Sequence, residues 1–131
     1  MQNLNDYVRS ADWKTEKHVP AITLPETVRA GEWFDARVAV GQEIPHPNTT
    51  GHHIAWIALH FIPKDGKYSI VIGRQEFGAH GQDAGGPDQG PAHTDSAAVF
   101  RMKTAVPGTL AATAYCNIHG LWTCARGVDV E

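Results

Sequence analysis

Short runs of apolar and β-branched residues, separated by proline or glycine, make up most of the chain. In residues 32–40 apolar and polar side chains largely alternate, which is the period of a strand with one covered face. Residues 54–62 (IAWIALHFI) are almost continuously apolar, which is typical of a strand with both faces covered. Runs this short and this rich in β-branched and aromatic residues predict β-strands.

Five further runs fit the same pattern. They lie at residues 21–28, 68–72, 97–103, 109–115 and 127–131, the last as a closing edge strand. Pro25 interrupts the first run, and the dipeptides Asp65-Gly66 and Pro107-Gly108 supply turns between later ones. Strands of this length with regular turns predict an all-β fold, an immunoglobulin-like antiparallel β-sandwich of about seven strands.

Two segments lie outside this strand pattern. Residues 78–91 contain five glycines and two prolines and are expected to form one long surface loop. Residues 1–13 show no clean period and are expected to form an N-terminal arm or a short helix. No internal repeat is visible, and 131 residues is an ordinary size for one domain. Residues 1–131 are therefore predicted to be a single domain.

Composition and charge narrow the classes of function. Eleven Lys and Arg against 14 Asp and Glu leave a net charge of −3, so nothing indicates a nucleic-acid-binding face or a basic membrane-binding face. No apolar run approaches the roughly 20 residues of a spanning helix, and the first residues lack the features of a signal peptide. We therefore expect a cytoplasmic protein. Two cysteines do not make a disulfide framework, although a single bridge between Cys116 and Cys124 stays open.

The histidines carry the candidate chemistry, because five of the eight fall into three motifs. These are EKHVP at 16–20, HPNTTGHH at 46–53 and CNIHG at 116–120. A Cys-x2-His pair on one turn is a common way to grip a transition metal, and ligands on separate loops can converge at one end of a sandwich. Four imidazoles with one thiolate do not make a closed structural zinc site. Five protein ligands favour a five- or six-coordinate metal with one position open.

The residues alone leave alternatives open. If the His52-His53 pair enters a strand, its side chains point to opposite faces and only one can bind, but spacing does not choose between them. An electron-transfer copper site would use two histidines, one cysteine and often a methionine. Met102 precedes Cys116 and no methionine follows it, which disfavours copper. A structural zinc site or a ligand-binding sandwich without catalysis is the remaining alternative.

The three motifs, in this order and near these separations, resemble the superoxide reductases, and specifically the one-iron neelaredoxins. The resemblance runs from about Asp12 to the C-terminus. It implies one iron per chain (Fe2+/Fe3+) with four equatorial histidines and one axial thiolate, which reduces superoxide to hydrogen peroxide without producing dioxygen. The ligands that it implies are His18, His46, His52, Cys116 and His119. It therefore chooses His52 over His53. With only two cysteines, the chain cannot build the four-cysteine iron module of the related desulfoferrodoxins.

Two charged residues precede the first histidine and are the predicted catalytic residues. Lys17 offers a mobile positive charge that would steer superoxide and stabilise the product. By resemblance, Glu16 takes the open iron position in the resting ferric state and leaves on reduction. An exposed ion pair worth less than about 1 kcal/mol is the alternative for both. The resemblance also implies a rubredoxin-like electron donor and a homo-oligomer, a dimer or a tetramer.

The remaining residues of interest receive ordinary roles. His60 is expected to be a core or edge residue of its strand, and His80 and His93 to be exposed. Trp122 either packs over the metal site or belongs to the core. Cys124 is expected to behave as a small hydrophobic residue.

Overall fold

The chain folds into seven strands and one turn of 3-10 helix, and the computed structural model describes all 131 residues. The strands are β1 (Ala21–Thr23), β2 (Phe34–Ala39), β3 (Ile54–Pro63), β4 (Ile70–Glu76), β5 (Ala97–Met102), β6 (Gly108–Cys116) and β7 (Gly120–Val128). The helical turn, η1 (Leu4–Tyr7), lies within the predicted N-terminal arm.

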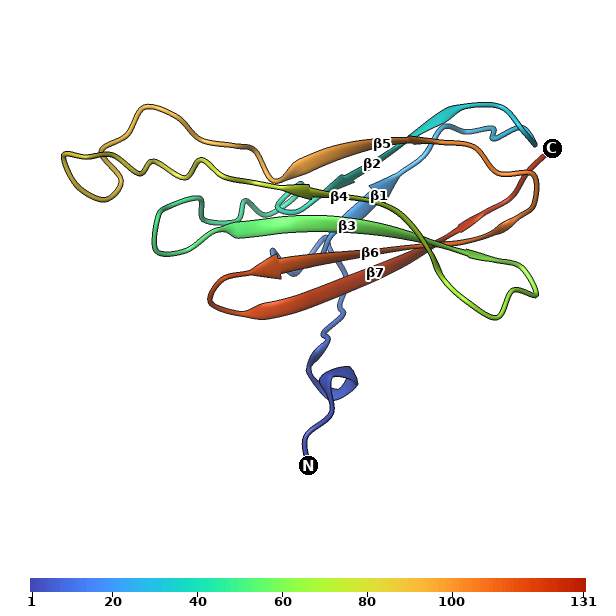
Figure 1. Cartoon of the computed structure of the whole chain (residues 1–131), viewed down its shortest axis with the longest axis horizontal. Coiled ribbons are helices and arrows are strands. Elements are labelled where there is room, and N and C mark those ends of the chain that lie inside the picture. The colour runs from blue at the N-terminus through green and yellow to red at the C-terminus, as the bar shows by residue number, and fades with distance from the viewer.

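The strands form two antiparallel sheets that face each other (Figure 1). One sheet has the order β1-β2-β5 and the other the order β4-β3-β6-β7. In a constant-type immunoglobulin sandwich the fourth strand belongs to the first sheet, whereas here β4 pairs with β3 in the second sheet. The arrangement is otherwise that of an immunoglobulin fold. The predicted all-β, immunoglobulin-like sandwich is confirmed.

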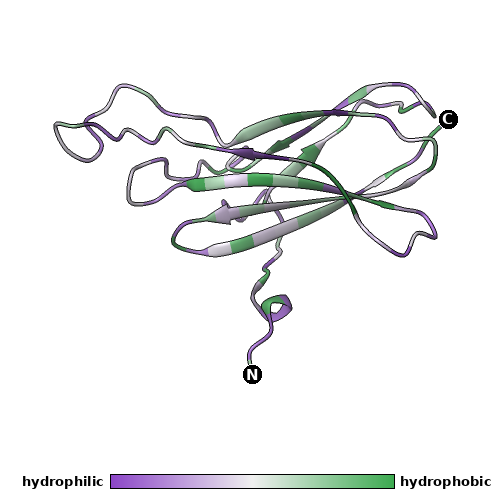
Figure 2. Cartoon of the chain, in the orientation of Figure 1, coloured by the Kyte–Doolittle hydropathy of each residue, from purple (hydrophilic) through white to green (hydrophobic).

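Alternation along the strands builds the core between the sheets. In β2, Phe34, Ala36 and Val38 are buried, whereas Asp35 and Arg37 between them are exposed. Inward side chains of both sheets form one cluster of 18 buried residues. Figure 2 shows the hydrophobic residues concentrated on the strands and the start of the N-terminal arm as hydrophilic. The period-2 pattern in the sequence is therefore the signature of this two-layer packing.

One strand is less covered than its sequence predicts. The inward residues Ile57 and Leu59 of β3 are fully buried. The outward residues Trp56 and His60 are only partly buried, and Ile62 is 39% exposed. The expectation that both faces of this strand are covered is wrong, because a two-layer sandwich leaves the outer face of each sheet towards solvent.

The last strand also differs from its prediction. The sequence predicts an edge strand at residues 127–131, but β7 begins at Gly120 and pairs with β6 along its whole length. Gly120 has a φ of +81°, and it starts the strand directly after the CNIHG turn. Residues 121–127 (LWTCARG) mix polar and apolar side chains without regular alternation, so the hydrophobic pattern does not reveal them.

The N-terminal arm joins the sandwich at the edge of β7. The Arg9 N–H donates to the Leu121 carbonyl at 3.0 Å, and the Thr123 N–H donates to the Arg9 carbonyl at 2.9 Å. The residues before Arg9, which include η1, project away from the sheets (Figure 1), and none of the η1 residues is buried. No helix of the chain has the length and apolar character needed to cross a membrane.

Candidate metal centre

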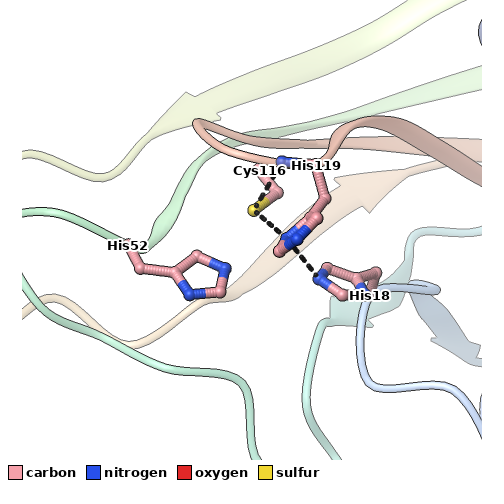
Figure 3. A group of neighbouring side chains, drawn as sticks. All are labelled: His18, His52, Cys116 and His119. Carbon is pink, nitrogen blue, oxygen red and sulfur yellow. Dashed lines mark hydrogen bonds between the residues drawn. The ribbon is translucent and has the colours of Figure 1, made fainter.

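The three histidine motifs meet at the end of the sandwich where β3 begins and β6 turns into β7. His18 lies just before β1, His52 in the loop before β3, and Cys116 and His119 at the β6–β7 turn. One nitrogen or sulfur atom of each of these four residues lies within 4.8 Å of the corresponding atoms of the other three. Figure 3 shows the four side chains arranged around a common space. Four of the five predicted ligands thus form one group.

His46, the fifth predicted ligand, borders this group. Its ring centroid lies 5.0 Å from that of His18 and 4.8 Å from that of His52. Its Nε2 atom is buried and has no hydrogen-bond partner. All five predicted side chains are therefore brought to one place, with His46 slightly outside the tightest cluster.

The β6–β7 turn places the thiol and one imidazole together. Cys116 is the last residue of β6, is fully buried and belongs to the hydrophobic core cluster. The backbone N–H of His119 donates to Cys116 Sγ at 3.3 Å, and His119 Nδ1 lies 3.8 Å from the same sulfur. Hydrogen bonds of this kind stabilise a thiolate and adjust the properties of a metal that it binds.

Two of the histidines are oriented by hydrogen bonds through Nδ1. His18 Nδ1 lies 2.6 Å from Glu16 Oε1, and His46 Nδ1 lies 2.7 Å from the Pro47 carbonyl. In each ring this leaves Nε2 for another partner. A second ring nitrogen held by a carboxylate or a carbonyl is the usual arrangement of a metal-binding histidine.

The donor atoms that remain suit a transition metal. Nε2 of His46 and Nε2 of His52 are both buried without a partner, and a buried polar atom left unpaired costs about 1–3 kcal/mol. His18 Nε2 lies 3.1 Å from His119 Nδ1, so these two nitrogens also face each other. Four imidazole nitrogens and one sulfur are ligands that iron accepts. The residues present fit an iron ion.

Burial favours the neutral form of two of these imidazoles, those of His46 and His52. It lowers the pKa of His46 to about 4, and the charges of His18, His52 and Lys17 lower it further, against the raising effect of the Pro47 carbonyl. Burial is also the main cause that lowers the pKa of His52. A neutral imidazole has a free lone pair, so these two side chains can bind a metal without first losing a proton.

Glu16 supports His18 in this structure. Its Oε1 atom accepts the backbone N–H of His18 at 3.0 Å and contacts His18 Nδ1. Burial would raise the pKa of Glu16, but the hydrogen bonds from His18 and the charge of Lys17 outweigh it and the pKa is lowered. The carboxylate therefore stands at Nδ1, on the opposite edge of the imidazole from the Nε2 atom that faces the cluster.

Lys17 is partly buried, and its ammonium joins none of the three salt bridges of the chain. Its positive charge contributes to lowering the pKa values of Glu16, His46 and His52. The ammonium is therefore unpaired, and its charge favours the neutral form of His46 and His52.

Two neighbours complete the surroundings of the cluster. Trp122 is 8% exposed and stacks on His18 with ring centroids 4.9 Å apart, and its Nε1–H donates to the His119 carbonyl at 3.2 Å. Of its two expected roles, packing over the site is the one observed. Asn117 is not among the predicted site residues, although it stands inside the CNIHG motif and its hydrogen bonds join two of the motifs.

Cys124 and the other histidines lie outside the cluster. Both cysteines are free, and burial raises the pKa of the Cys124 thiol to about 11, as befits a small hydrophobic residue. His53 stacks on His80 with ring centroids 3.6 Å apart and does not belong to the group. His93 is exposed, as expected.

The prediction that His80 is exposed is wrong. It is 5% exposed, with Nδ1 2.8 Å from Asn48 Oδ1 and Nε2 2.7 Å from the Phe77 carbonyl. The glycine-rich loop folds back against the 46–53 loop, where Asp88 accepts hydrogen bonds from the backbone and the hydroxyl of Thr50. Glycine and proline content predicts a loop but not the surface on which that loop packs.

Comparison with known proteins agrees with this geometry. The desulfoferrodoxin family model matches residues 10–125. Neelaredoxin from Megalodesulfovibrio gigas is 49% identical over 96% of this chain and 97% of its own length. Superoxide reductase from Pyrococcus furiosus is 49% identical over 91% of this chain and 94% of its own length.

A solved structure extends the similarity to three dimensions. The superoxide reductase (neelaredoxin) from Archaeoglobus fulgidus in the reduced form matches with a TM-score of 0.89 at 48% identity, covering 95% of this chain and 99% of that chain. The family model, the full-length relatives and the shared fold agree with one another. The chain belongs to the desulfoferrodoxin family, among its superoxide reductases of the neelaredoxin type.

Proposed function

We propose that this chain binds one iron ion and reduces superoxide to hydrogen peroxide. The proposed ligands are His18, His46, His52, Cys116 and His119. The observation that carries the proposal is the convergence of three distant segments on one group of nitrogen and sulfur atoms, bordered by the unpartnered Nε2 of His46. Without a metal, the buried Nε2 atoms of His46 and His52 would stay unsatisfied.

Iron bound there would supply the one electron that, with two protons, converts superoxide to hydrogen peroxide. The protein's part is to prepare the donor atoms. The neutral imidazoles add no charge, and the Cys116 thiolate donates electron density, which is one of the ways in which proteins adjust iron. The hydrogen bond from the His119 N–H to Sγ limits that donation. The thiolate and its hydrogen bond would together set the reduction potential.

Lys17 and Glu16 would act around the metal. Superoxide is an anion, and the unpaired ammonium of Lys17 lies where its charge acts on His46 and His52, so it would attract the substrate electrostatically. Glu16 would hold His18 in orientation through Nδ1. To act also as a ligand in the resting ferric state, the Glu16 carboxylate would have to leave His18.

Metal content and colour test this proposal together. We expect about one iron per chain and a thiolate-to-iron charge-transfer band that superoxide pulses generate from the reduced protein. Cys116→Ser should abolish the band. Cys124→Ser is the matched control, since Cys124 lies outside the cluster, and it should leave the band unchanged. A wild-type protein that contains zinc, or that stays colourless after superoxide pulses, would overturn the proposal in favour of a non-catalytic metal site.

The partners and the setting remain predictions. A reductase needs an external source of electrons, and a rubredoxin-like protein is the donor that the resemblance implies. Assembly into a dimer or tetramer and a cytoplasmic location rest on the same resemblance and on the expectations from sequence. Turnover with reduced rubredoxin and the mass of the protein in solution would test the first two.

A further inference from the structure

Asn117 lies between two of the proposed ligands without being one. It directly follows Cys116 and stands two residues before His119. Its backbone N–H donates to the His53 carbonyl at 3.1 Å, which extends the β3–β6 pairing one residue beyond Ile54 and Cys116. After this point the chain enters the β6–β7 turn, and the backbone ladder between β3 and β6 ends.

Beyond the end of that ladder, the Asn117 side chain makes the next hydrogen bonds to the loop. Its Oδ1 atom accepts the backbone N–H of His53 at 2.8 Å, and its Nδ2 atom donates to the Gly51 carbonyl at 3.0 Å. Asparagine amides readily imitate a peptide group in this way. The two bonds hold the peptide groups on either side of His52, namely the Gly51–His52 peptide and the His52–His53 peptide.

No other residue makes this connection. All three hydrogen bonds between the 46–53 loop and the 116–120 turn involve Asn117. Thr49 also holds His52, since its hydroxyl accepts the His52 N–H at 3.1 Å and its own N–H donates to the His52 carbonyl at 2.9 Å. Thr49, however, belongs to the same loop, so it shapes the loop without fixing its distance from the turn.

We propose that Asn117 is a positioning residue that sets the place of His52 relative to Cys116 and His119. This inference rests on the proposed iron site, but not on superoxide as the substrate. Metal ligands must lie within a few tenths of an ångström of their ideal positions. A side chain that clamps both peptides of one ligand to the turn carrying two others meets this need without touching the metal.

Iron-loaded full-length proteins provide the test. Asn117→Ala removes both side-chain bonds, and Asn117→Asp keeps an acceptor for the His53 N–H while losing the donor to Gly51. The control is Ser96→Ala, which removes a partly buried hydrogen bond from the Ser96 hydroxyl to the Val40 carbonyl (2.8 Å), directly beyond the paired ends of β2 and β5. The measurements are the rate of iron release to a chelator and the energy of the thiolate-to-iron charge-transfer band.

We expect Asn117→Ala to release iron faster than wild type, in line with the roughly 10- to 100-fold loss of metal affinity that follows the loss of outer partners of metal ligands, and to have a shifted band. Asn117→Asp should lie between Asn117→Ala and wild type, and Ser96→Ala should match wild type in both measurements. A role in stability alone would lower the free energy of unfolding of Asn117→Ala but leave its band and its iron release unchanged.

Two failures can be told apart. If the wild-type protein binds no iron, the proposed site is wrong and the inference falls with it. If wild type binds iron but Asn117→Ala releases it at the wild-type rate with an unshifted band, the inference alone is overturned. If Asn117→Ala does not fold, a folded Asn117→Asp protein that releases iron at the wild-type rate also overturns the inference.

Discussion

The 116–120 turn and the 46–53 loop each carry two proposed ligands, but they are held in different ways. The turn closes the β6–β7 hairpin, whose backbone pairing runs without interruption from Gly108 and Val128 to Cys116 and Gly120. The loop contains no strand, and apart from the backbone bond between Asn117 and His53 it is held to its surroundings by hydrogen bonds that involve side chains. Ligands on the turn are thus positioned by the fold, whereas ligands on the loop depend on a few polar side chains.

This difference indicates which substitutions should change metal binding most. Asn117 joins the loop to the turn, while Asn48 and Thr50 join it to His80 and Asp88 of the glycine-rich loop. Backbone pairing along a hairpin is cooperative and survives most single substitutions on its surface. Side-chain bonds are individually removable, so substitutions in or against the loop should change metal binding while leaving the fold intact.

The largest expected effect comes from the histidine pair at the end of the loop. His52→Ala should weaken iron binding by more than the roughly 10- to 100-fold typical of an outer partner, because it removes a ligand nitrogen that is buried and unpaired. His53→Ala is the matched control, since its ring stacks on His80 outside the cluster. Iron content after dialysis against a chelator measures both, and loss of iron only in His53→Ala would contradict the assignment.

Acid should destabilise the metal-free protein through the same loop. The pKa of His46 is lowered to about 4 by burial, and that of His52 is lowered too, whereas an unfolded histidine titrates near 6.5. Between these values the unfolded chain binds more protons, so the free energy of unfolding falls as pH drops from about 6.5 towards 4. We expect a loss of about 1–2 kcal/mol, given the partial solvent exposure of both rings.

Urea unfolding of the metal-free protein at neutral and acidic pH measures this loss. His46→Gln should reduce the dependence on pH, because it removes the group with the largest shift. Stability that stays level or rises on acidification would contradict the account of the loop as the place where neutral histidines are buried.

Two glycines test the conformations of the two segments. Gly120 has a φ of +81° and open space where a Cβ would stand, so Gly120→Ala should cost about 1 kcal/mol through backbone strain alone. Gly51 has open space and no positive φ, so Gly51→Ala should change stability by less than about 0.5 kcal/mol. Thermal unfolding compares them, and equal losses would show that the turn has no special need for glycine.

The smallest expected effect concerns the charge near the loop. Lys17→Ala should slow the reaction with superoxide roughly two- to fivefold at low ionic strength and less at high ionic strength. Lys64→Ala is the control, because Lys64 follows the last residue of β3, at the opposite end of the sandwich from the cluster. An unchanged second-order rate constant for Lys17→Ala at low salt would remove Lys17 from the mechanism.

Periodicity and composition predict most of the fold but little of the support around the site. Six of the seven strands overlap predicted runs, although β1 ends at Thr23, before the end of its run, and β4 continues to Glu76, beyond the end of its run. The start of β7 could not be found in this way, since Gly120 and the turn set it rather than hydrophobicity. The roles of Asn117 and of the buried His80 depend on contacts between segments far apart in the chain, which no local pattern contains.

The proposed ligands are likewise predicted only in part from the chemistry of the residues. Chemistry indicates an open histidine-rich site with one thiolate and leaves the pair His52-His53 undecided. The family resemblance chooses His52, and the fold turns the His52 ring to the cluster and the His53 ring to His80. The Glu16 carboxylate contacts His18 Nδ1, and spacing alone does not predict this contact.

The ratio of hydrogen peroxide formed to superoxide consumed, measured with iron-loaded protein and an excess of reductant, tests the central claim most directly. Reduction at the proposed site predicts about one peroxide per superoxide, no dioxygen, and loss of the catalysed rate in Cys116→Ser but not in Cys124→Ser. About half a peroxide per superoxide with release of dioxygen, or a rate no faster than the uncatalysed reaction, would contradict it.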